Sequence, residues 1–355
     1  MKNLVDIEFV GLGDRGLTAL RLLLQSARHL PLHISALRDT DPARVSAAQK
    51  LVADSQNCEI ADLSARPWPH DTSESCQIRL TYISTDWQSH APLALEAMRR
   101  GRHVAIEVPA ALTLEAIGEL VATSRQTGCH CFMLENCCYD PPLLEAIARI
   151  RAGEIGEVVH AEGTYYHTLG ERWTPWRLDM NRRQRGDLYP THELAPLCMA
   201  LGVSPARPVD ETATATNDRL ATLVCMDSAP LTGPATYEQH LGTPAPDFLN
   251  GDHTTTLIRT ARGRTIVLRH DVLTELPYER LFHVVGTRGT ITVSDDGSTP
   301  HDTLTTAMNE RLIMALAEGR PLDFDVTDLA VWCAVTPLST LSIERGFAPV
   351  AFPVF

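Results

Sequence analysis

The chain has 355 residues, of which 44% are hydrophobic and 21% charged, and its formal net charge is −13 at pH 7. This length exceeds one ordinary hydrophobic core and predicts two domains, and the composition is that of a folded protein rather than a disordered one. The negative charge opposes binding to a phosphate backbone, and no run of about 18 to 20 uninterrupted apolar residues is present. Neither nucleic acid nor a membrane is therefore expected as a partner.

Apolar periodicity in the first 140 residues alternates between strands and helices. It predicts strands at 4–10, 33–37, 78–84, 103–107 and 130–134, and helices at 16–28, 42–53, 91–100 and 114–126. Strands separated by helices of this length indicate an α/β fold with a parallel, doubly wound sheet. We therefore expect a Rossmann domain over residues 1–138.

The pattern changes after a predicted helix at 141–152. Longer alternating runs predict a largely antiparallel sheet, with strands at 157–168, 219–227, 253–262, 264–273 and 281–293. Residues 228–252, which are rich in Pro and Gly, are expected to form a long loop, and helices are expected near 304–318 and 325–346. We interpret residues 139–355 as an α+β domain for substrate binding and oligomerisation, with its C-terminal helix packed back on the first domain. An open face of its sheet favours a homo-oligomer.

Two features of the sequence bear on the compartment. Asp6 and Glu8 lie where a signal peptide would need an apolar core, so we expect a mature cytoplasmic protein. The nine cysteines are an odd number in a chain long enough to need no disulfide scaffold, which predicts reduced thiols.

A glycine turn follows the first predicted strand. Gly11, Gly13 and Gly16 form the G-x-G-x-x-G pattern of dinucleotide-binding domains, in which the glycines allow a tight turn, approach of the pyrophosphate and close helix–strand packing. Asp39, just after the second strand, is placed to accept hydrogen bonds from the ribose hydroxyls and would repel a 2′-phosphate. Although the neighbouring Arg38 is able to serve such a phosphate, the carboxylate favours NAD over NADP.

Three other groups of residues carry side chains that could bind a ligand. Cys129, Cys131, Cys137 and Cys138 lack the C-x₂-C spacing of structural zinc sites, so they are interpreted as structural thiols. His160, His167 and His192 have no accompanying carboxylate spacing, and no metal is expected. Arg182, Arg183 and Arg185 favour a solvated charged loop over a phosphate site, and their role stays open.

Several blocks of sequence resemble a known family. The EVPAA segment at Glu107–Ala111 and the MLENCCYD segment at Met133–Asp140 resemble the Gfo/Idh/MocA superfamily, and within it the chain is most similar to the NAD-dependent glycosidases of glycoside hydrolase family 109, whose best known activity is α-N-acetylgalactosaminidase. Further blocks that carry the resemblance are Thr85–His90, Tyr165–His167, Trp176–Arg177, Gly186–His192, Gly251–Thr256 and Pro277–Arg280.

The resemblance implies two sets of binding residues. The first set would contact NAD together with the glycines and comprises Asp14, Arg15, Asp39, Trp87, Gln88, Ser89, His90, Glu107, Val108 and Asn136. The second would line a sugar site and comprises Tyr165, His167, Arg177, Tyr189, Pro190, Thr191, His192 and Tyr278.

The resemblance also implies a reaction. NAD would oxidise the sugar at its 3-hydroxyl carbon, Tyr165 would remove the acidified proton on carbon 2 so that the anomeric group leaves, and water addition and hydride return would complete the hydrolysis. His192 would handle the 3-hydroxyl proton or orient the sugar, and Arg177 or the oxidised nicotinamide would supply the positive charge that a tyrosine base needs. Val108 stands where the superfamily's dehydrogenases carry a proton-relaying Lys, which favours hydrolysis over net dehydrogenation.

The chain departs from the family at four places, which we expect on the substrate side: Thr168, Glu193, Ala195 and the segment from His301 to Thr305. The expected substrate is a carbohydrate glycoside, with N-acetylhexosaminides among the candidates, and the sugar and anomer stay open. An NAD-dependent sugar oxidoreductase and a non-catalytic NAD-binding homologue remain the alternatives.

Overall fold

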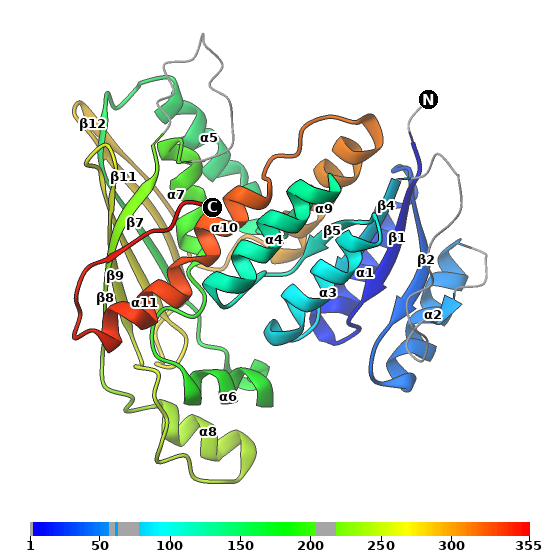
Figure 1. The fold of residues 1–355 in the computed structure, drawn as a ribbon, viewed down its shortest axis with the longest axis horizontal. Coiled ribbons are helices and arrows are strands. Elements are labelled where there is room, and N and C mark those ends of the chain that lie inside the picture. Colours follow the sequence, from blue (N-terminus) through cyan, green and yellow to red (C-terminus); the bar gives the residue numbers. More distant parts are fainter. Residues whose placement is uncertain (1–2, 57–60, 63–77, 204–217) are drawn as a thin grey trace. The chain divides into compact units, whose positions relative to one another are not determined.

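The structure is a computed structural model that describes residues 3–56, 61–62, 78–203 and 218–355 (Figure 1). The chain forms two compact units. One holds the described residues up to Tyr139 together with His301–Ala330, and the other holds Asp140–Pro300 and Val331–Phe355. Each unit is built around its own β-sheet.

The sheet of the first unit is parallel, with the strand order β3-β2-β1-β4-β5-β6. Its strands are β1 (Val5–Val10), β2 (Leu32–Arg38), β3 (Ala61–Asp62), β4 (Ile78–Ile83), β5 (His103–Ile106) and β6 (Cys131–Met133). The helices between them are α1 (Asp14–Ser26), α2 (Pro42–Gln56), α3 (Trp87–Arg99) and α4 (Leu114–Thr127), followed by the 3-10 turn η1 (Asn136–Tyr139). The order reverses beside β1, where doubly wound sheets bind ligands. The predicted parallel doubly wound sheet is confirmed.

Two acidic residues of β1 are accommodated by arginines from another part of the unit. Glu8 is 7% exposed, and its carboxylate lies 3.3 Å from both Arg100 Nη2 and Arg102 Nε. Burial raises the pKa of Glu8, while the two guanidinium groups oppose that shift. Arg102 also lies 3.6 Å from Asp6, so the charges in this central strand are paired rather than isolated.

Helix α9 (His301–Glu318) belongs to the first unit. It packs against α1, β1 and η1, because buried apolar residues such as Leu304 and Met308 recur along one of its faces. The sequence-based division placed residues 139–355 together, and the structure differs in assigning His301–Ala330 to the first unit. That assignment depends on contacts with elements nearly 300 residues earlier, which periodicity alone does not report.

The second unit contains a sheet with the strand order β12-β11-β7-β10-β9-β8-β13. Its strands are β7 (Val158–Tyr166), β8 (Leu220–Asp227), β9 (Thr254–Thr260), β10 (Thr265–Asp271), β11 (Glu279–Gly286), β12 (Gly289–Asp295) and β13 (Val350–Ala351). Neighbours are antiparallel except β7 and β10, which run parallel. The predicted α+β unit with a largely antiparallel sheet is confirmed.

Helices cover one face of this sheet. They are α5 (Pro141–Arg151), α7 (Thr191–Leu201) and α11 (Val335–Glu344), of which α7 packs on β7, β10 and β11 and α11 on β8. On β9, Thr256 and Ile258 are buried while Leu257 and Arg259 are exposed, so the other face of that strand is open. The homo-oligomer expected from such a face stays a prediction.

The segment predicted as a long loop at 228–252 contains helix α8 (Gly233–Leu241), so that prediction is wrong in part. The Asp252 carboxylate accepts hydrogen bonds of 2.9 to 3.2 Å from the amides of Leu231, Thr232 and Gly233, at the helix start. This acceptor follows the helix in the chain instead of preceding it, so the sequence shows no ordinary N-cap signal.

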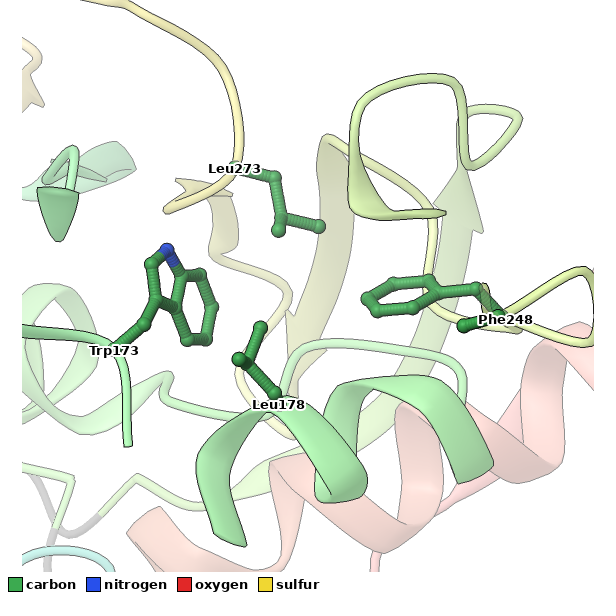
Figure 2. Packing of buried hydrophobic residues seen from close by; sticks show 5 residues of the cluster. Trp173, Leu178, Phe248 and Leu273 are labelled. Carbon is green, nitrogen blue, oxygen red and sulfur yellow. The ribbon is translucent and has the colours of Figure 1, made fainter. Parts of the chain in front are cut away.

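A small apolar cluster fastens α8 to α6 (Pro175–Arg183) and to the 3-10 turn η2 (Gly170–Arg172) beside it. Figure 2 shows Trp173, Leu178, Phe248 and Leu273 pointing toward one another. All four are buried, and Leu178 is fully inaccessible. The cluster is a satellite core that holds the chain on either side of α6 in place.

Helices α10 (Val326–Cys333) and α11 together span Val326–Glu344, a stretch long and apolar enough to cross a membrane by length and composition. Polar residues such as Asp328 and Thr336 interrupt it, which is why no uninterrupted run is visible in the sequence. In the structure 83% of its apolar window is buried, as in the core helix of a folded domain, so it is weak evidence for a membrane segment.

We predict that Asp252→Ala lowers the free energy of unfolding by about 1 to 3 kcal/mol, because three amides lose a buried, charged acceptor. Urea denaturation of the whole chain measures this change. Asp247→Ala is the matched control, since Asp247 forms a 2.6 Å ion pair with Arg182 but its side chain is 64% exposed. The control should lose clearly less stability, because solvent screens an exposed ion pair. Equal losses in the two variants would contradict the importance of the buried acceptor.

Candidate functional site

The three glycines of the turn between β1 and α1 are required for different physical reasons. Gly11 has φ +91°, and a Cβ there would lie 2.2 Å from the Ser84 carbonyl oxygen. A Cβ at Gly16 would lie 2.0 Å from the carbonyl oxygen of Gly11, so the protein itself requires both. Gly13 has an ordinary extended backbone, and its nearest neighbour would be Arg44 Nη1 at 3.7 Å. The open side of Gly13 at the start of α1 fits a pyrophosphate approaching the backbone amides.

Asp39 connects the end of β2 to this turn. Its Oδ2 accepts a hydrogen bond of 2.6 Å from the Leu12 amide, and its Oδ1 accepts one of 2.8 Å from the Asp41 amide. The carboxylate is only partly buried, and it stands at the carboxyl end of a strand beside the switch point. An acidic side chain in this place recognises the ribose of a dinucleotide whose pyrophosphate lies on the glycine turn.

Three residues predicted to contact NAD meet on the same side of the first unit. Arg15 Nε donates to Glu107 Oε1 at 2.8 Å, and Asn136 Nδ2 donates to Thr305 Oγ1 at 2.9 Å. Arg15 Nη2 also donates to Thr305 at 3.3 Å, and Asn136 lies 3.1 Å from His301 Nε2. His301 and Thr305, which the sequence placed on the substrate side, lie in the first unit, where α9 brings them to Arg15 and Asn136.

Most of the remaining residues predicted to bind NAD lie at the start of α3. Trp87 and His90 are buried, while Gln88 is exposed, and Ser89 is fixed by the Asp86 carboxylate, which accepts from its amide at 3.1 Å and its hydroxyl at 2.7 Å. His90 lies 2.7 Å from the Pro109 carbonyl oxygen and 3.2 Å from that of Thr85, so it ties two loops together.

In the same loop region Val108 is 5% exposed, and it offers no group that exchanges a proton. Asp14 is exposed at the first turn of α1.

The second unit gathers aromatic and imidazole rings around Tyr165, at the end of β7. Tyr165 is 7% exposed, and its hydroxyl lies 2.7 Å from His167 Nδ1. The His192 ring stands edge-on to it with centroids 4.9 Å apart. The rings of Tyr189, His270 and Tyr278 also have their centroids within 6.2 Å of the Tyr165 ring centroid. The structure thus brings together most of the residues predicted to line a sugar site.

Helix α7 supplies several of these residues from one place. His192 lies in its first turn, where Pro190 is the N-cap and Thr191 is buried. A Cβ at Gly163 would lie 2.8 Å from the Glu193 carbonyl oxygen, so the absence of a side chain there lets α7 lie directly on β7. Because Gly163 and Tyr165 are two residues apart on the strand, they share a face, and the close approach places His192 against the Tyr165 ring.

His167 lies between Tyr165 and a cation. Arg172 Nη1, from η2, is 3.1 Å from His167 Nε2. Burial lowers the pKa of His167 to about 4, with smaller contributions from Arg172, His192 and Arg177. Arg177 stacks on Trp176 at 4.9 Å and donates to the Arg172 carbonyl at 3.5 Å, so it lies one step further from the tyrosine.

Buried polar residues that the sequence did not single out lie next to this cluster. Asp187 is fully buried next to the Glu193 side chain, and His270 Nδ1 lies 3.7 Å from the Asp187 carboxylate. Burial raises the pKa of Asp187 well above its ordinary value, against the hydrogen bond from the Tyr189 amide. Glu193, one of the departures, is thus a buried carboxyl engaged with Asp187. Asp187 lies within the GDLYPTH block, the one sequence signal that pointed to it.

The other departures from the family, and the arginine, histidine and cysteine groups considered above as ligand sites, lie within the protein as follows. Thr168 Oγ1 donates to the carbonyls of Thr274 at 2.9 Å and Leu276 at 3.1 Å, and Ala195 is fully buried in α7. Arg182 and Arg185 pair with Asp247 and Asp227, and Arg183 pairs with Asp179. His160 lies 2.7 Å from Thr265 Oγ1 on the sheet, and Cys129, Cys131, Cys137 and Cys138 are buried.

Comparisons with known proteins identify both parts of the chain. Residues 5–135 match the family model described as an oxidoreductase family with an NAD-binding Rossmann fold, and residues 139–297 match the model of the glycosyl hydrolase 109 C-terminal domain. The first unit is therefore an NAD-binding domain, and the residues at its switch point fit that cofactor.

Full-length relatives carry the same family name. The chain is 37% identical to glycosyl hydrolase family 109 protein 1 from Bacteroides fragilis, covering 99% of this chain and 85% of that protein. It is likewise 37% identical to a glycosyl hydrolase family 109 protein from Porphyromonas gingivalis, with 99% and 84% covered. Among solved structures it shares its fold with myo-inositol 2-dehydrogenase from Lactobacillus plantarum, at a TM-score of 0.76 and 13% identity over 99% of this chain and 100% of the other.

We predict that Gly13→Ala weakens NAD binding by about tenfold or more while leaving the protein as stable as the parent, because its backbone tolerates a Cβ that a pyrophosphate would not. Gly16→Ala is the contrasting variant, since its Cβ would clash with Gly11 and should lower the unfolding temperature. Calorimetric titration with NAD and thermal unfolding measure the two effects. Unchanged NAD affinity in Gly13→Ala would contradict the placement of the pyrophosphate.

We also predict acid destabilisation from His270. This residue is 4% exposed, and burial lowers its pKa to about 4, below the ordinary 6.5. Between these two values the unfolded chain binds a proton that the folded chain does not, so stability present above pH 6.5 is lost as the pH falls. His270 contributes at most about 1.4 kcal/mol per pH unit to the slope of the unfolding free energy against pH. Urea unfolding from pH 7 to 4 should show a shallower slope for His270→Gln, and identical slopes would refute this origin.

Proposed function

Because this chain belongs to glycosyl hydrolase family 109, we propose that it hydrolyses a glycoside with NAD as a catalytic group that ends each turnover in its starting redox state. The observation that supports this most is the cluster around Tyr165, where a phenol hydroxyl lies 2.7 Å from one imidazole and a second imidazole stands edge-on to its ring. Such a site offers a base and a proton carrier next to each other.

The buried carboxyls of the same unit do not suit the usual glycosidase mechanism. Glycosidases that use two carboxylates hold them about 5 to 9.5 Å apart on either side of the scissile bond. Asp187 and Glu193 are both buried and lie next to each other, so they do not flank a sugar from opposite sides. Among the described residues around Tyr165, the groups able to exchange protons with a sugar are therefore the phenol and the imidazoles.

In the proposed reaction the residues act on protons, and NAD when bound supplies a reversible hydride acceptor for the carbon that bears the 3-hydroxyl. His192 takes the proton of that hydroxyl. The adjacent carbonyl acidifies the hydrogen on carbon 2, and Tyr165 Oη removes it, so that the electron pair expels the anomeric oxygen as the leaving group. Water adds to the resulting double bond, with its oxygen at the anomeric carbon and a proton at carbon 2. Once the hydride has returned to carbon 3, His192 gives its proton back to the 3-oxygen, and the net change is hydrolysis.

Val108 favours this reaction over net dehydrogenation. A valine that is 5% exposed carries no proton, so it does not relay one from a substrate hydroxyl to solvent. The substrate is a carbohydrate, in line with the family, and the departures Thr168 and Glu193 in the second unit leave its identity and anomer to experiment. A sugar oxidoreductase or a non-catalytic NAD-binding protein would show itself in the same assays.

The proposed activity is tested with a panel of p-nitrophenyl glycosides of both anomers, with and without added NAD. We expect nitrophenol release without stoichiometric NADH. Accumulation of NADH on free sugars without cleavage of any glycoside would instead identify an oxidoreductase, and neither signal, with NAD still bound, would identify a non-catalytic protein.

Tyr165→Phe should reduce turnover by about 10² to 10⁴-fold and abolish exchange of the carbon 2 hydrogen with deuterated water, because the base is lost. Tyr166→Phe is the matched control, since the next residue of β7 points to the opposite face and its ring lies 5.7 Å from His253. Mass spectrometry of the product sugar measures the exchange. Exchange that persists in Tyr165→Phe would remove this tyrosine from its role.

A further inference from the structure

Three side chains form a continuous chain of polar contacts in the second unit. The Tyr165 hydroxyl lies 2.7 Å from His167 Nδ1, and the other ring nitrogen of His167 lies 3.1 Å from Arg172 Nη1. The order is therefore phenol, imidazole and guanidinium. Each nitrogen of the His167 imidazole contacts one of the other two side chains. The nitrogen that carries the proton therefore decides whether the Tyr165 hydroxyl donates or accepts a hydrogen bond.

The guanidinium fixes that position. A guanidinium group only donates hydrogen bonds, so Nε2 of His167 must be the acceptor in its contact with Arg172. A neutral imidazole carries one proton, which then resides on Nδ1. His167 is neutral near pH 7, because burial lowers its pKa to about 4 and the charges of Arg172, His192 and Arg177 act in the same direction.

We propose that Arg172 is a positioning residue, which holds His167 with its proton on Nδ1 so that this N–H donates to Tyr165 Oη and stabilises the phenolate form of the base. The catalytic use of the phenolate rests on the proposed function. The direction of the hydrogen bond does not. The opposite tautomer would accept the hydroxyl proton of Tyr165 and stabilise the neutral phenol, which is not a base.

The chain around Arg172 is built to present it. Arg172 ends the 3-10 turn η2, and its amide donates to the Leu169 carbonyl at 2.9 Å. Trp173, the next residue, is anchored in the apolar cluster of Figure 2, and Arg177 donates to the Arg172 carbonyl at 3.5 Å. Although the guanidinium itself is exposed, its backbone is held on both sides, which reduces the freedom of the side chain to leave His167.

Other titratable groups face Tyr165 from the elements packed around it. His192 and Tyr189 come from α7 and the residues before it, His270 from β10, and Tyr278 from the residues before β11. His270 is neutral near pH 7, since burial lowers its pKa to about 4. Because these ring contacts do not involve Arg172, we expect them to persist in Arg172 variants, so that a change in the Tyr165 titration reports the contact through His167.

The direct test is nuclear magnetic resonance of the full chain labelled with ¹⁵N-histidine and with tyrosine carrying ¹³C at Cζ. In the parent we expect His167 with a protonated Nδ1 and an unprotonated Nε2 near pH 7. In Arg172→Met we expect the proton to redistribute to Nε2 and the midpoint of the Tyr165 tyrosinate titration to rise by about one pH unit or more. A protonated Nε2 in the parent, or an unchanged tautomer in Arg172→Met, overturns the proposal.

Two further variants separate positioning from loss of charge or fold. Arg172→Lys keeps a donor and should restore most of the parent titration. Arg183→Met removes the same charge from α6, where Arg183 donates to Asp179 at 3.0 Å and is 66% exposed, and should leave His167 and Tyr165 unchanged. If Arg183→Met shifts the Tyr165 titration as much as Arg172→Met does, the effect is general electrostatics and the proposal fails.

Catalysis supplies an independent reading. With a cleaved glycoside in hand, Arg172→Met should lower kcat about tenfold at pH 7 with little change in KM, and move the basic-group limb of its pH profile upward by the same amount as the tyrosinate titration. If the predicted tautomer and titration shift are found but no glycoside is cleaved, the proposed function fails while the hydrogen-bond direction set by Arg172 stands. If Tyr165→Phe retains carbon 2 exchange, Tyr165 is not the base and the catalytic part of the Arg172 proposal fails. If the basic-group limb falls at the same pH in the parent and in Arg172→Met, Arg172 has no effect on the base.

Discussion

The close approach of helix α7 to strand β7 at Gly163 is the constraint on which the candidate sugar site depends. A Cβ there would lie within 3 Å of Glu193, so any other residue would push the helix from the sheet. Because the helix begins just before His192, this contact also sets how near the imidazole comes to the Tyr165 ring. A missing side chain on one strand therefore determines the spacing of the groups proposed to exchange protons with the substrate.

Burial decides the protonation of the groups around that contact. His167 and His270 lose their positive charge in the folded chain because burial disfavours the charged imidazole, and Asp187 keeps its proton more readily because burial disfavours the charged carboxylate. The result is a site in which His167 and His270 are neutral, two buried carboxyl groups lie next to each other and the cations lie at the margin. Such a setting suits proton transfer through neutral hydrogen-bonded groups better than the opposed carboxylates of the usual glycosidases.

The NAD-binding unit was predictable because its signals are local. Gly11, Gly13 and Gly16 lie in one turn, Asp39 follows the next strand, and alternating strands and helices leave few topologies. Family membership and the cofactor, both expected from short blocks of sequence, are confirmed. Tyr165 and His192 were named from such blocks, and the structure brings them into contact, while their catalytic roles remain proposals.

The sequence by itself determined the two sheets, the glycine turn and the residue types available for chemistry, because backbone periodicity and turn sterics act over a few neighbouring residues. Only the tertiary structure decided that His301 and Thr305 join Arg15 in the first unit, that Asp252 starts α8, and that Glu193 meets Asp187. It also brought Arg172 to His167 through the packing of Trp173. Each of these depends on contacts or hydrogen bonds set by how whole elements pack, a geometry that no local pattern of residues encodes.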